Sequence, residues 1–213
     1  LESQLHKDDF ELVKMLFLPS DNENLINILF EQNKPFNANG IFPKNFLDPD
    51  LDNPYHLPGY MHEYINYVKN QETRELSLHN KNLLQRMFYD FLLNVKNDFL
   101  RAYFTFELNV KNILTAINCK HFQINPEQQI IQAGTNLNVS TLLHKTNLKP
   151  ELFEEEVPFA EQLFRIAESE SNAIEKEKTI DKIKWDYLDE QTFFHYFTIE
   201  KTLSFCIKLI LTE

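Results

Sequence analysis

The sequence predicts an all-α protein built as a multi-helix bundle. Apolar residues recur with the period of an amphipathic helix along most of the chain, and no stretch alternates in the manner of a half-buried strand. Of the 213 residues, 43% are hydrophobic and 19 are phenylalanine, so the chain can bury a core of large aromatic side chains. This composition is typical of a packed globular protein rather than of a disordered one.

Capping and stop signals place the helices. Asp8 and Asp9 can cap the first helix and Pro19 stops it, Asp21 can cap the second, and Pro158 suits the first turn of a later one. We expect helices at residues 8–18, 21–33, 60–70, 158–167, 173–189 and 192–211, and a long helical region at residues 80–122.

Residues 34–58 differ in composition from the helices on either side. This segment is rich in proline and asparagine and shows no sustained hydrophobic period. Proline removes backbone donors and fixes turns, so we expect a long ordered connection over the surface. A connection of this length inside a compact domain is often functional. Its expected anchors are the apolar residues Phe42, Phe46, Leu47 and Tyr55.

The change of composition suggests how the chain is divided. Residues 1–78 hold the N-terminal helices and the proline-rich connection, and residues 79–213 form a helical region that carries the motifs discussed below. The alternative is one continuous domain. The chain begins with Leu1 rather than Met, so we expect it to be part of a longer protein, truncated at its start.

Composition also opposes several classes of function. With only 3 glycines, the chain has no GxGxxG or GxxxxGK[ST] loop, in which backbone amides cradle phosphates. A formal net charge of -11 opposes binding to nucleic acid and to anionic lipid, because both reward clustered lysine and arginine. The acidic surface is compatible with a basic protein partner, and equally with a simple gain in solubility.

Cysteines and histidines indicate neither disulfides nor metal ligands. Cys119 and Cys206 are isolated on apolar stretches, as expected for small buried side chains in a reducing compartment. No two histidines have the i, i+4 spacing of a helical metal site. No apolar run approaches the ~20 residues of a membrane span. We therefore expect a cytoplasmic protein that is not an enzyme and binds no cofactor or metal.

A five-residue pattern occurs twice. Residues 103–107 read YFTFE and residues 196–200 read YFTIE. At ~100° per residue on a helical wheel, Glu107 falls about 40° from Tyr103, inside an apolar arc. Glu200 has the same relation to Tyr196. Each helix is therefore expected to place a carboxylate on its buried face, one turn after a tyrosine.

A carboxylate on a buried face must be paired or neutralised, which leaves three interpretations. The two glutamates fix helix packing through tyrosine hydroxyls, cations or backbone amides; or they contact a partner at the rim of the face; or they form a pair of catalytic carboxylates. Catalysis also needs a concave site and supporting groups. The packing interpretation is favoured on that ground.

Two long stretches resemble a known family. Residues 97–121, NDFLRAYFTFELNVKNILTAINCKH, and residues 180–211, which contain IKWDYLDEQTFFHYFTIEKTLSFCIKL, are similar to an uncharacterised family encoded in bacterial V/A-type ATPase operons. The early run DNENLINIL is similar as well. That family resembles the V-type ATPase C subunit, known as subunit d in the eukaryotic enzyme.

The C subunit consists of repeated helical units, each with an aromatic residue, a glutamate and an asparagine-(isoleucine/leucine) pair. The second copy here keeps Glu200 but has Thr202 and Phe205 where the asparagines stand. The chain also lacks the tyrosine-rich N-terminal segment of the family. The first copy matches the pattern at Glu107, Asn109, Asn112 and Ile113.

The resemblance implies a funnel-like helical protein that sits on a membrane rotor ring, receives the central shaft and transmits torque. Its partners would be the rotor ring and the shaft, and it would be cytoplasmic and peripheral to the inner membrane. The alternative is a free-standing cytosolic scaffold or regulatory module that binds a partner helix in a groove. The expected structural or contact residues are Tyr103, Glu107, Asn109, Asn112, Tyr196 and Glu200.

Overall fold

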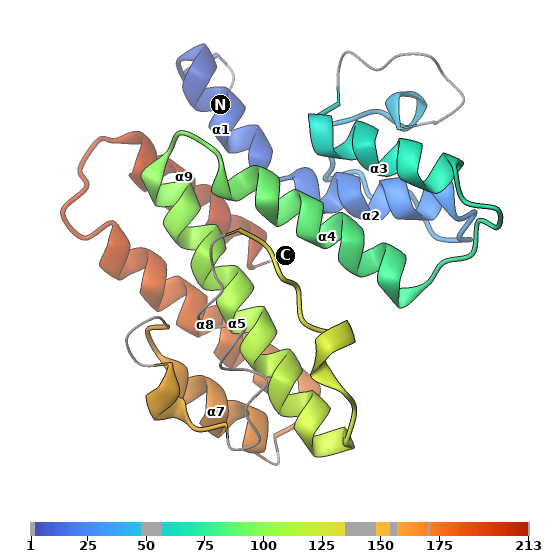
Figure 1. The fold of residues 1–213 in the computed structure, drawn as a ribbon. Coiled ribbons are helices and arrows are strands. Elements are labelled where there is room, and N and C mark those ends of the chain that lie inside the picture. Colours follow the sequence, from blue (N-terminus) through green and yellow to red (C-terminus); the bar gives the residue numbers. More distant parts are fainter. Residues whose placement is uncertain (1–2, 48–56, 135–147, 154–156, 170, 213) are drawn as a thin grey trace. The chain divides into compact units, whose positions relative to one another are not determined.

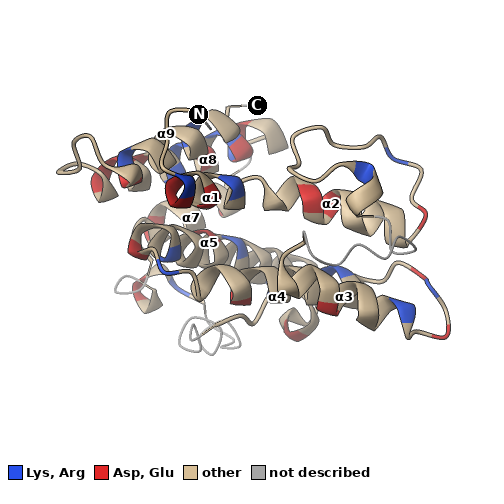
Figure 2. Ribbon diagram, turned by 90° about the horizontal axis from the view of Figure 1, so that it is seen from above, with Lys and Arg blue, Asp and Glu red and all other residues tan. Residues whose placement is uncertain are grey.

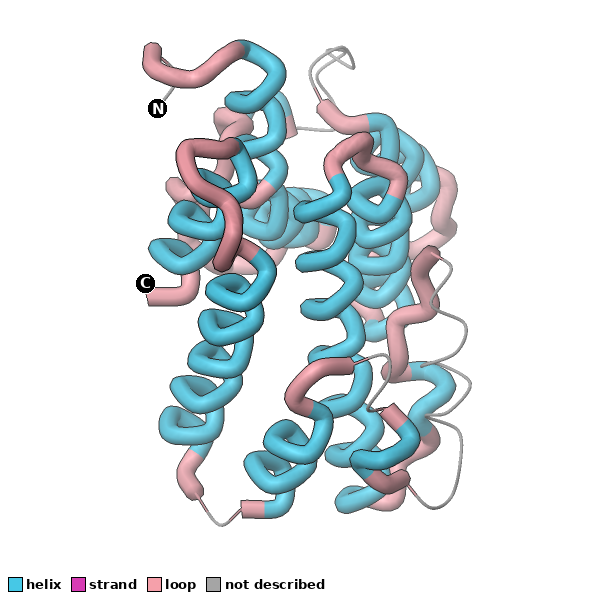
Figure 3. The backbone as a smooth tube through the Cα atoms, turned by 90° about the vertical axis from the view of Figure 1, so that its left-hand side faces the viewer, coloured by secondary structure: helices cyan, strands magenta, loops and turns pink. Residues whose placement is uncertain are grey.

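The computed structural model describes residues 3–47, 57–134, 148–153, 157–169 and 171–212, and within these ranges the chain is helical and contains no strand (Figure 1 and Figure 3). The predicted all-α class is confirmed for this part of the chain. Its α-helices are α1 (Lys7–Met15), α2 (Leu18–Leu29), α3 (Gly59–Lys69), α4 (Leu78–Leu93), α5 (Asp98–Phe122), α7 (Ala160–Glu168), α8 (Ala173–Gln191) and α9 (Ile199–Ile210). Short 3₁₀ turns are η1 (Lys44–Phe46), η3 (Pro126–Gln128) and η4 (Pro150–Leu152).

The chain folds as two compact units. The first comprises residues 1–88 and 197–213, and the second comprises residues 89–196. Helix α4 runs out of the first unit into the second, because the boundary after residue 88 falls inside it. This division therefore lies within a helix, and differs from the boundary after residue 78 that the change of composition suggested.

In the first unit, α1 packs against α9, and α2 packs against α3. The helices bury apolar positions three or four residues apart, as amphipathic helices must when they share a core. Tyr64 is fully buried, and its hydroxyl donates to the backbone oxygen of Asn80 (3.0 Å), which ties α3 to the start of α4. The core residues include Val13, Leu25, Leu29, Met61, Val68, Leu84, Leu203 and Ile207.

Asp21 anchors the proline-rich connection instead of capping a helix. Helix α2 begins at Leu18, so Asp21 lies inside its first turn and the predicted cap at this residue is wrong. Its buried carboxylate accepts hydrogen bonds from the backbone amides of Ile41 and Phe42, both at 3.0 Å. Burial raises the pKa of the carboxyl, and the two amides counteract that rise. The side chain thereby satisfies two donors that no helix or strand pairs.

Asn24 holds the same connection one turn further along α2. Its side-chain nitrogen donates to the backbone oxygen of Asn37 (2.9 Å), and its side-chain oxygen accepts from the amide of Asn37 (2.7 Å). Leu47, predicted as an anchor, is fully buried at the end of the described part of the connection. Tyr55, also predicted as an anchor, lies outside the described residues. Side chains of α2 thus bond the described part of the connection, residues 34–47, which contains one short 3₁₀ turn, η1.

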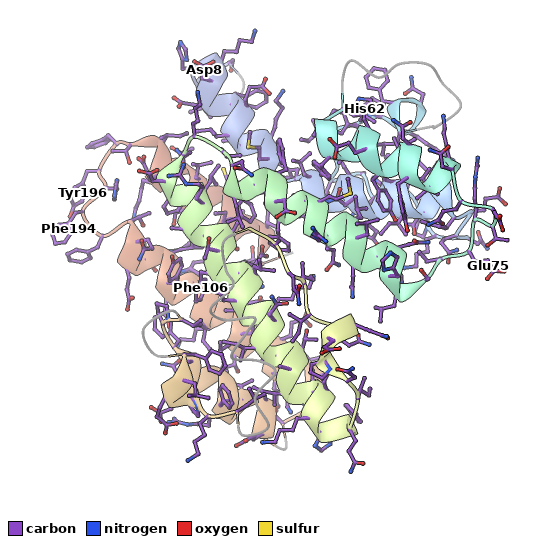
Figure 4. The ribbon with its side chains drawn as sticks, in the orientation of Figure 1. Asp8, His62, Glu75, Phe106, Phe194 and Tyr196 are labelled. Atoms are coloured by element: carbon purple, nitrogen blue, oxygen red, sulfur yellow. The ribbon has the colours of Figure 1, made fainter. Side chains whose placement is uncertain are left out.

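In the second unit, α7, α8 and η3 pack against α5. The helical region predicted at residues 80–122 contains two helices, α4 and α5, because Asn97 accepts a hydrogen bond from the amide of Leu100 (2.9 Å) and caps a new helix there. Phe106 of α5 stacks on Tyr187 of α8, with ring centroids 3.9 Å apart and ring planes 10° from parallel (Phe106 is labelled in Figure 4). This pair fixes α8 against the middle of α5.

The final helix is shorter than predicted. A helix was expected over residues 192–211, but α8 continues to Gln191 and α9 begins only at Ile199. Thr192 is fully buried and its hydroxyl donates to the backbone oxygen of Leu188 (2.7 Å) at the end of α8. Phe197 has a φ of 58°, a left-handed conformation that a right-handed helix cannot contain. Two helices are therefore separated by an irregular connection at residues 192–198.

Replacing Gly40 by alanine is expected to destabilise the first unit, because a Cβ there would collide with Oδ1 of Asp21. That oxygen cannot withdraw without losing its bond to the amide of Phe42. The free energy of unfolding, measured by urea denaturation, should fall by about 1–3 kcal/mol. Gly59→Ala is the matched control, since a Cβ there meets nothing within 4 Å. Equal losses in the two variants would contradict the contact.

Candidate functional site

The first copy of the repeated pattern lies on α5, in the interior of the second unit. Tyr103 is buried and Glu107 is half-buried. The hydroxyl of Tyr89, near the end of α4, donates a hydrogen bond to Oε2 of Glu107 (3.2 Å). A tyrosine hydroxyl is one of the partners that the packing interpretation requires. Glu107 thereby connects the last turns of α4 to the middle of α5.

Burial governs protonation around Glu107. It raises the pKa of Tyr89 and of Tyr103 well above the ordinary tyrosine value, and the negative charge of Glu107 raises both further. It lowers the pKa of Lys111, one turn along α5, where attraction to Glu107 opposes the effect and repulsion from Lys184 adds to it. The phenols therefore stay neutral across the physiological range, which suits packing rather than proton transfer.

The two asparagines of the pattern are also buried on α5. The side-chain nitrogen of Asn112 donates to the backbone oxygen of Ile131 (2.8 Å), and its oxygen accepts from the amide of Ile131 (2.9 Å). This bidentate pair holds the irregular segment after η3 against the helix. Asn109 is 2% exposed, three residues earlier. The structure thus places Tyr103, Glu107, Asn109 and Asn112 together on one helix, in structural surroundings.

The second copy of the pattern has a different environment. Only Ile199 and Glu200 lie in α9, where Glu200 is half-buried in the first turn. Tyr196 precedes the helix and is 71% exposed, so the expectation that it lies on a buried helical face is wrong. The boundary between the two units also falls directly after Tyr196. The two copies of the pattern therefore do not lie on equivalent helices of repeated units.

Tyr196 is one of four exposed aromatic side chains that lie close together in the sequence. We call residues 193–197 the aromatic segment. Phe194 and Tyr196 project from the connection between α8 and α9, away from the drawn helices (Figure 4). Singly exposed apolar residues are ordinary, but a contiguous exposed apolar patch marks an interaction surface. The exposed fractions are 64% for Phe193, 84% for Phe194, 71% for Tyr196 and 107% for Phe197.

The sequence contained a signal for this exposure. Residues 193–197 read FFHYF, and five successive residues cover about 400° of a helical wheel. A helix with one buried face could not bury all four aromatic rings. The match between the two five-residue patterns singles out Tyr196 and Glu200. The unusual feature of this part of the sequence is instead the aromatic run that contains Tyr196.

Acidic residues flank the aromatic segment along the chain. The last turns of α8 carry Asp186, Asp189 and Glu190, and the first turn of α9 carries Glu200, followed by Lys201. The carbonyl end of α8 adds partial negative charge next to Phe193. Figure 2 shows both red acidic and blue basic positions along the helices of the chain. The candidate functional site is therefore an exposed aromatic segment that directly follows the acidic end of α8.

Two other features are absent from the described residues. These residues contain no group of three or more histidine, cysteine, aspartate or glutamate side chains placed to hold a metal ion. Among the helices that the structure describes, none has the length and apolar character needed to cross a membrane.

One family model matches residues 1–213, and its description reads "Protein of unknown function (DUF2764)". No curated protein and no solved structure matches the chain.

Glu107→Ala is expected to lower the free energy of unfolding by about 1–3 kcal/mol, because Tyr89 loses its carboxylate partner in the interior. Glu107→Gln keeps an acceptor oxygen and should lose less. Glu161→Ala is the control: Glu161 pairs with Arg165 (2.8 Å) on an exposed surface, and its loss should change stability by at most about 0.5 kcal/mol. Urea denaturation measures all three. A loss no larger than the control's would remove Glu107 from the packing of α4 and α5.

Alkaline pH is expected to destabilise the fold through its buried tyrosines. Their folded pKa values lie above the unfolded value, so their contribution is complete below pH 10 and is lost as the pH rises through the folded values. In Tyr103→Phe, stability should fall less steeply between pH 9 and 11, by up to about 1 kcal/mol per pH unit. Parallel urea-unfolding profiles for the two proteins would show that Tyr103 ionises as readily in the fold as in the unfolded chain. The tyrosines with raised pKa values are Tyr60, Tyr64, Tyr89, Tyr103 and Tyr187.

Proposed function

The chain belongs to the DUF2764 family of proteins of unknown function, and from that premise we propose that it is a non-enzymatic central-stalk coupling subunit of a bacterial V/A-type ATPase. In this role it links the membrane rotor ring to the central shaft. It is cytoplasmic, peripheral to the inner membrane, and part of a complex. The sequence support is the resemblance of residues 97–121 and 180–211 to a family encoded in V/A-type ATPase operons.

The aromatic segment is the observation that carries the proposal. A protein that works alone gains nothing from four exposed aromatic rings, which favour aggregation in water. In a permanent assembly the same rings become buried, and aromatic side chains dominate the energetics of such interfaces. The exposed aromatic segment supports a subunit that is covered by a partner.

The second unit supports a mechanical role. Helix α5 is 25 residues long, α7 and α8 both pack against it, and α8 does so through the stacked rings of Phe106 and Tyr187. Close-packed interiors have low compressibility and transmit strain. A torque coupler needs such stiffness and needs no catalytic group. We further propose that the chain folds as a helical bundle of the V-type ATPase C-subunit kind. This proposal does not require both YFT(F/I)E copies to be helical.

A second candidate function is a free-standing cytosolic scaffold or regulatory module that binds one partner helix. The observation in its favour is on α9, where Phe205 and Leu209 are 61% and 51% exposed one turn apart. An i, i+4 apolar pair on an exposed helical face suits a partner helix. Enzymatic use of Glu107 with Glu200 has no such support, since Glu107 already serves the packing of α4 and α5.

Co-purification distinguishes the two functions. The full-length protein, expressed with its operon, should be recovered with V/A-type ATPase rotor and shaft subunits. The double variant Phe194→Ser/Tyr196→Ser should lose at least about tenfold of this recovery, since each serine removes an aromatic contact, while its urea unfolding curve stays unchanged. Phe122→Ser, at 67% exposure on α5, is the matched control.

Failure of any ATPase subunit to accompany the wild-type protein would contradict the central-stalk role. Full recovery with the double variant would show that the aromatic segment is not the contact.

A further inference from the structure

The start of the aromatic segment is bonded to the end of α8. Its first residue follows Thr192, whose hydroxyl is bonded to the end of α8, and the amide of His195 donates to the backbone oxygen of Thr192 (3.1 Å). The rings of Phe193 and Phe194 meet edge to face, with centroids 4.9 Å apart. A surface that is ordered before binding loses less conformational entropy when it binds. The segment is therefore a preformed projection.

We propose that this projection docks onto an apolar helical surface of a protein partner whose edges carry lysine or arginine. The inference rests on the proposed function only in assigning that surface to a rotor or shaft subunit. The chemistry of the partner follows from the segment itself, which presents aromatic rings directly after the acidic end of α8.

Charge selects among the possible occupants. Asp186, Asp189 and Glu190 lie in the last turns of α8, just before the segment, and the whole chain carries -11. An anionic bilayer and a nucleic acid strand both bring further negative charge to these carboxylates. A second copy of the chain brings the same acidic flank, so a symmetric pairing would oppose like charges. A basic-edged protein surface is complementary both to the local charge and to the net charge.

The apolar part of the contact comes from the rings. Phe194 and Phe197 expose nearly all of their surface, and each offers the large rigid contact area of interface anchors. The acidic flank then sets the partner's sign and the salt dependence of association. The two contributions can be varied separately, because the rings and the carboxylates are different residues.

The test uses the full chain and two synthetic helical peptides with the same leucine face, one edged by lysine and one by glutamate. Fluorescence anisotropy of the labelled peptides should show binding to the lysine peptide at least about tenfold tighter than to the glutamate peptide. Phe194→Ser/Tyr196→Ser should weaken binding of the lysine peptide about tenfold or more. Phe122→Ser, the matched exposed aromatic on α5, should leave it unchanged.

Two further measurements separate charge from apolar contact. Glu190→Lys should weaken binding to the lysine peptide and reduce its dependence on salt. A scrambled lysine peptide of the same composition, without a continuous leucine face, should bind about tenfold more weakly than the ordered one. If the scrambled peptide bound as tightly as the ordered one, or if Phe194→Ser/Tyr196→Ser left peptide binding unchanged, simple charge attraction would explain the binding. Either result would overturn the proposed docking surface.

Vesicles of anionic phospholipid provide the competing occupant. Binding to them that is tighter than to the lysine peptide, and lost in Phe194→Ser/Tyr196→Ser, would overturn the inference in favour of a membrane contact. Selective binding of the lysine peptide, without co-purification of ATPase subunits, would leave the inference intact and remove the proposed function. Co-purification of ATPase subunits without selective binding of the lysine peptide would leave the proposed function intact and remove the inference.

Discussion

Two irregular segments of this protein lie against helices because helix side chains bond their backbone groups. The side chains of Asp21 and Asn24 of α2 form hydrogen bonds with backbone groups of the proline-rich connection, and that of Asn112 of α5 does so with the backbone of Ile131. Each of these side chains is buried, where an unpaired amide or carbonyl would cost about 1–3 kcal/mol. The fold of both units depends on these few polar contacts as much as on the apolar core around them.

The sequence allowed prediction of what is periodic and local. The helical class and most helix positions followed from hydrophobic spacing, and the burial of Tyr103 followed from the wheel. It did not allow prediction of contacts that join distant residues. Asp21 looks like a helix cap because aspartate is a favoured cap, yet its amide partners lie 20 and 21 residues away. No pattern within α2 predicts those partners.

The misplaced start of the last helix has a related cause. Residues 192–198 contain no proline or glycine, so the usual signals for a helix break are absent. The break comes from a buried threonine at the end of α8 and from the left-handed backbone of Phe197. Because of it, two similar five-residue patterns serve different purposes: the first packs a helix and the second contributes to an exposed aromatic surface. Local similarity of sequence was therefore a poor guide to similarity of environment.

The bonds from helix side chains to irregular backbone also impose an order on folding. Asn24 is separated from its partner by 13 residues and Asn112 from its partner by 19, so each bond closes a loop whose entropic cost grows with its length. Helical turns form faster than such loops close, and the asparagines can present both polar atoms in register only once their helices exist. We therefore expect the irregular segments to dock only after their helices have formed.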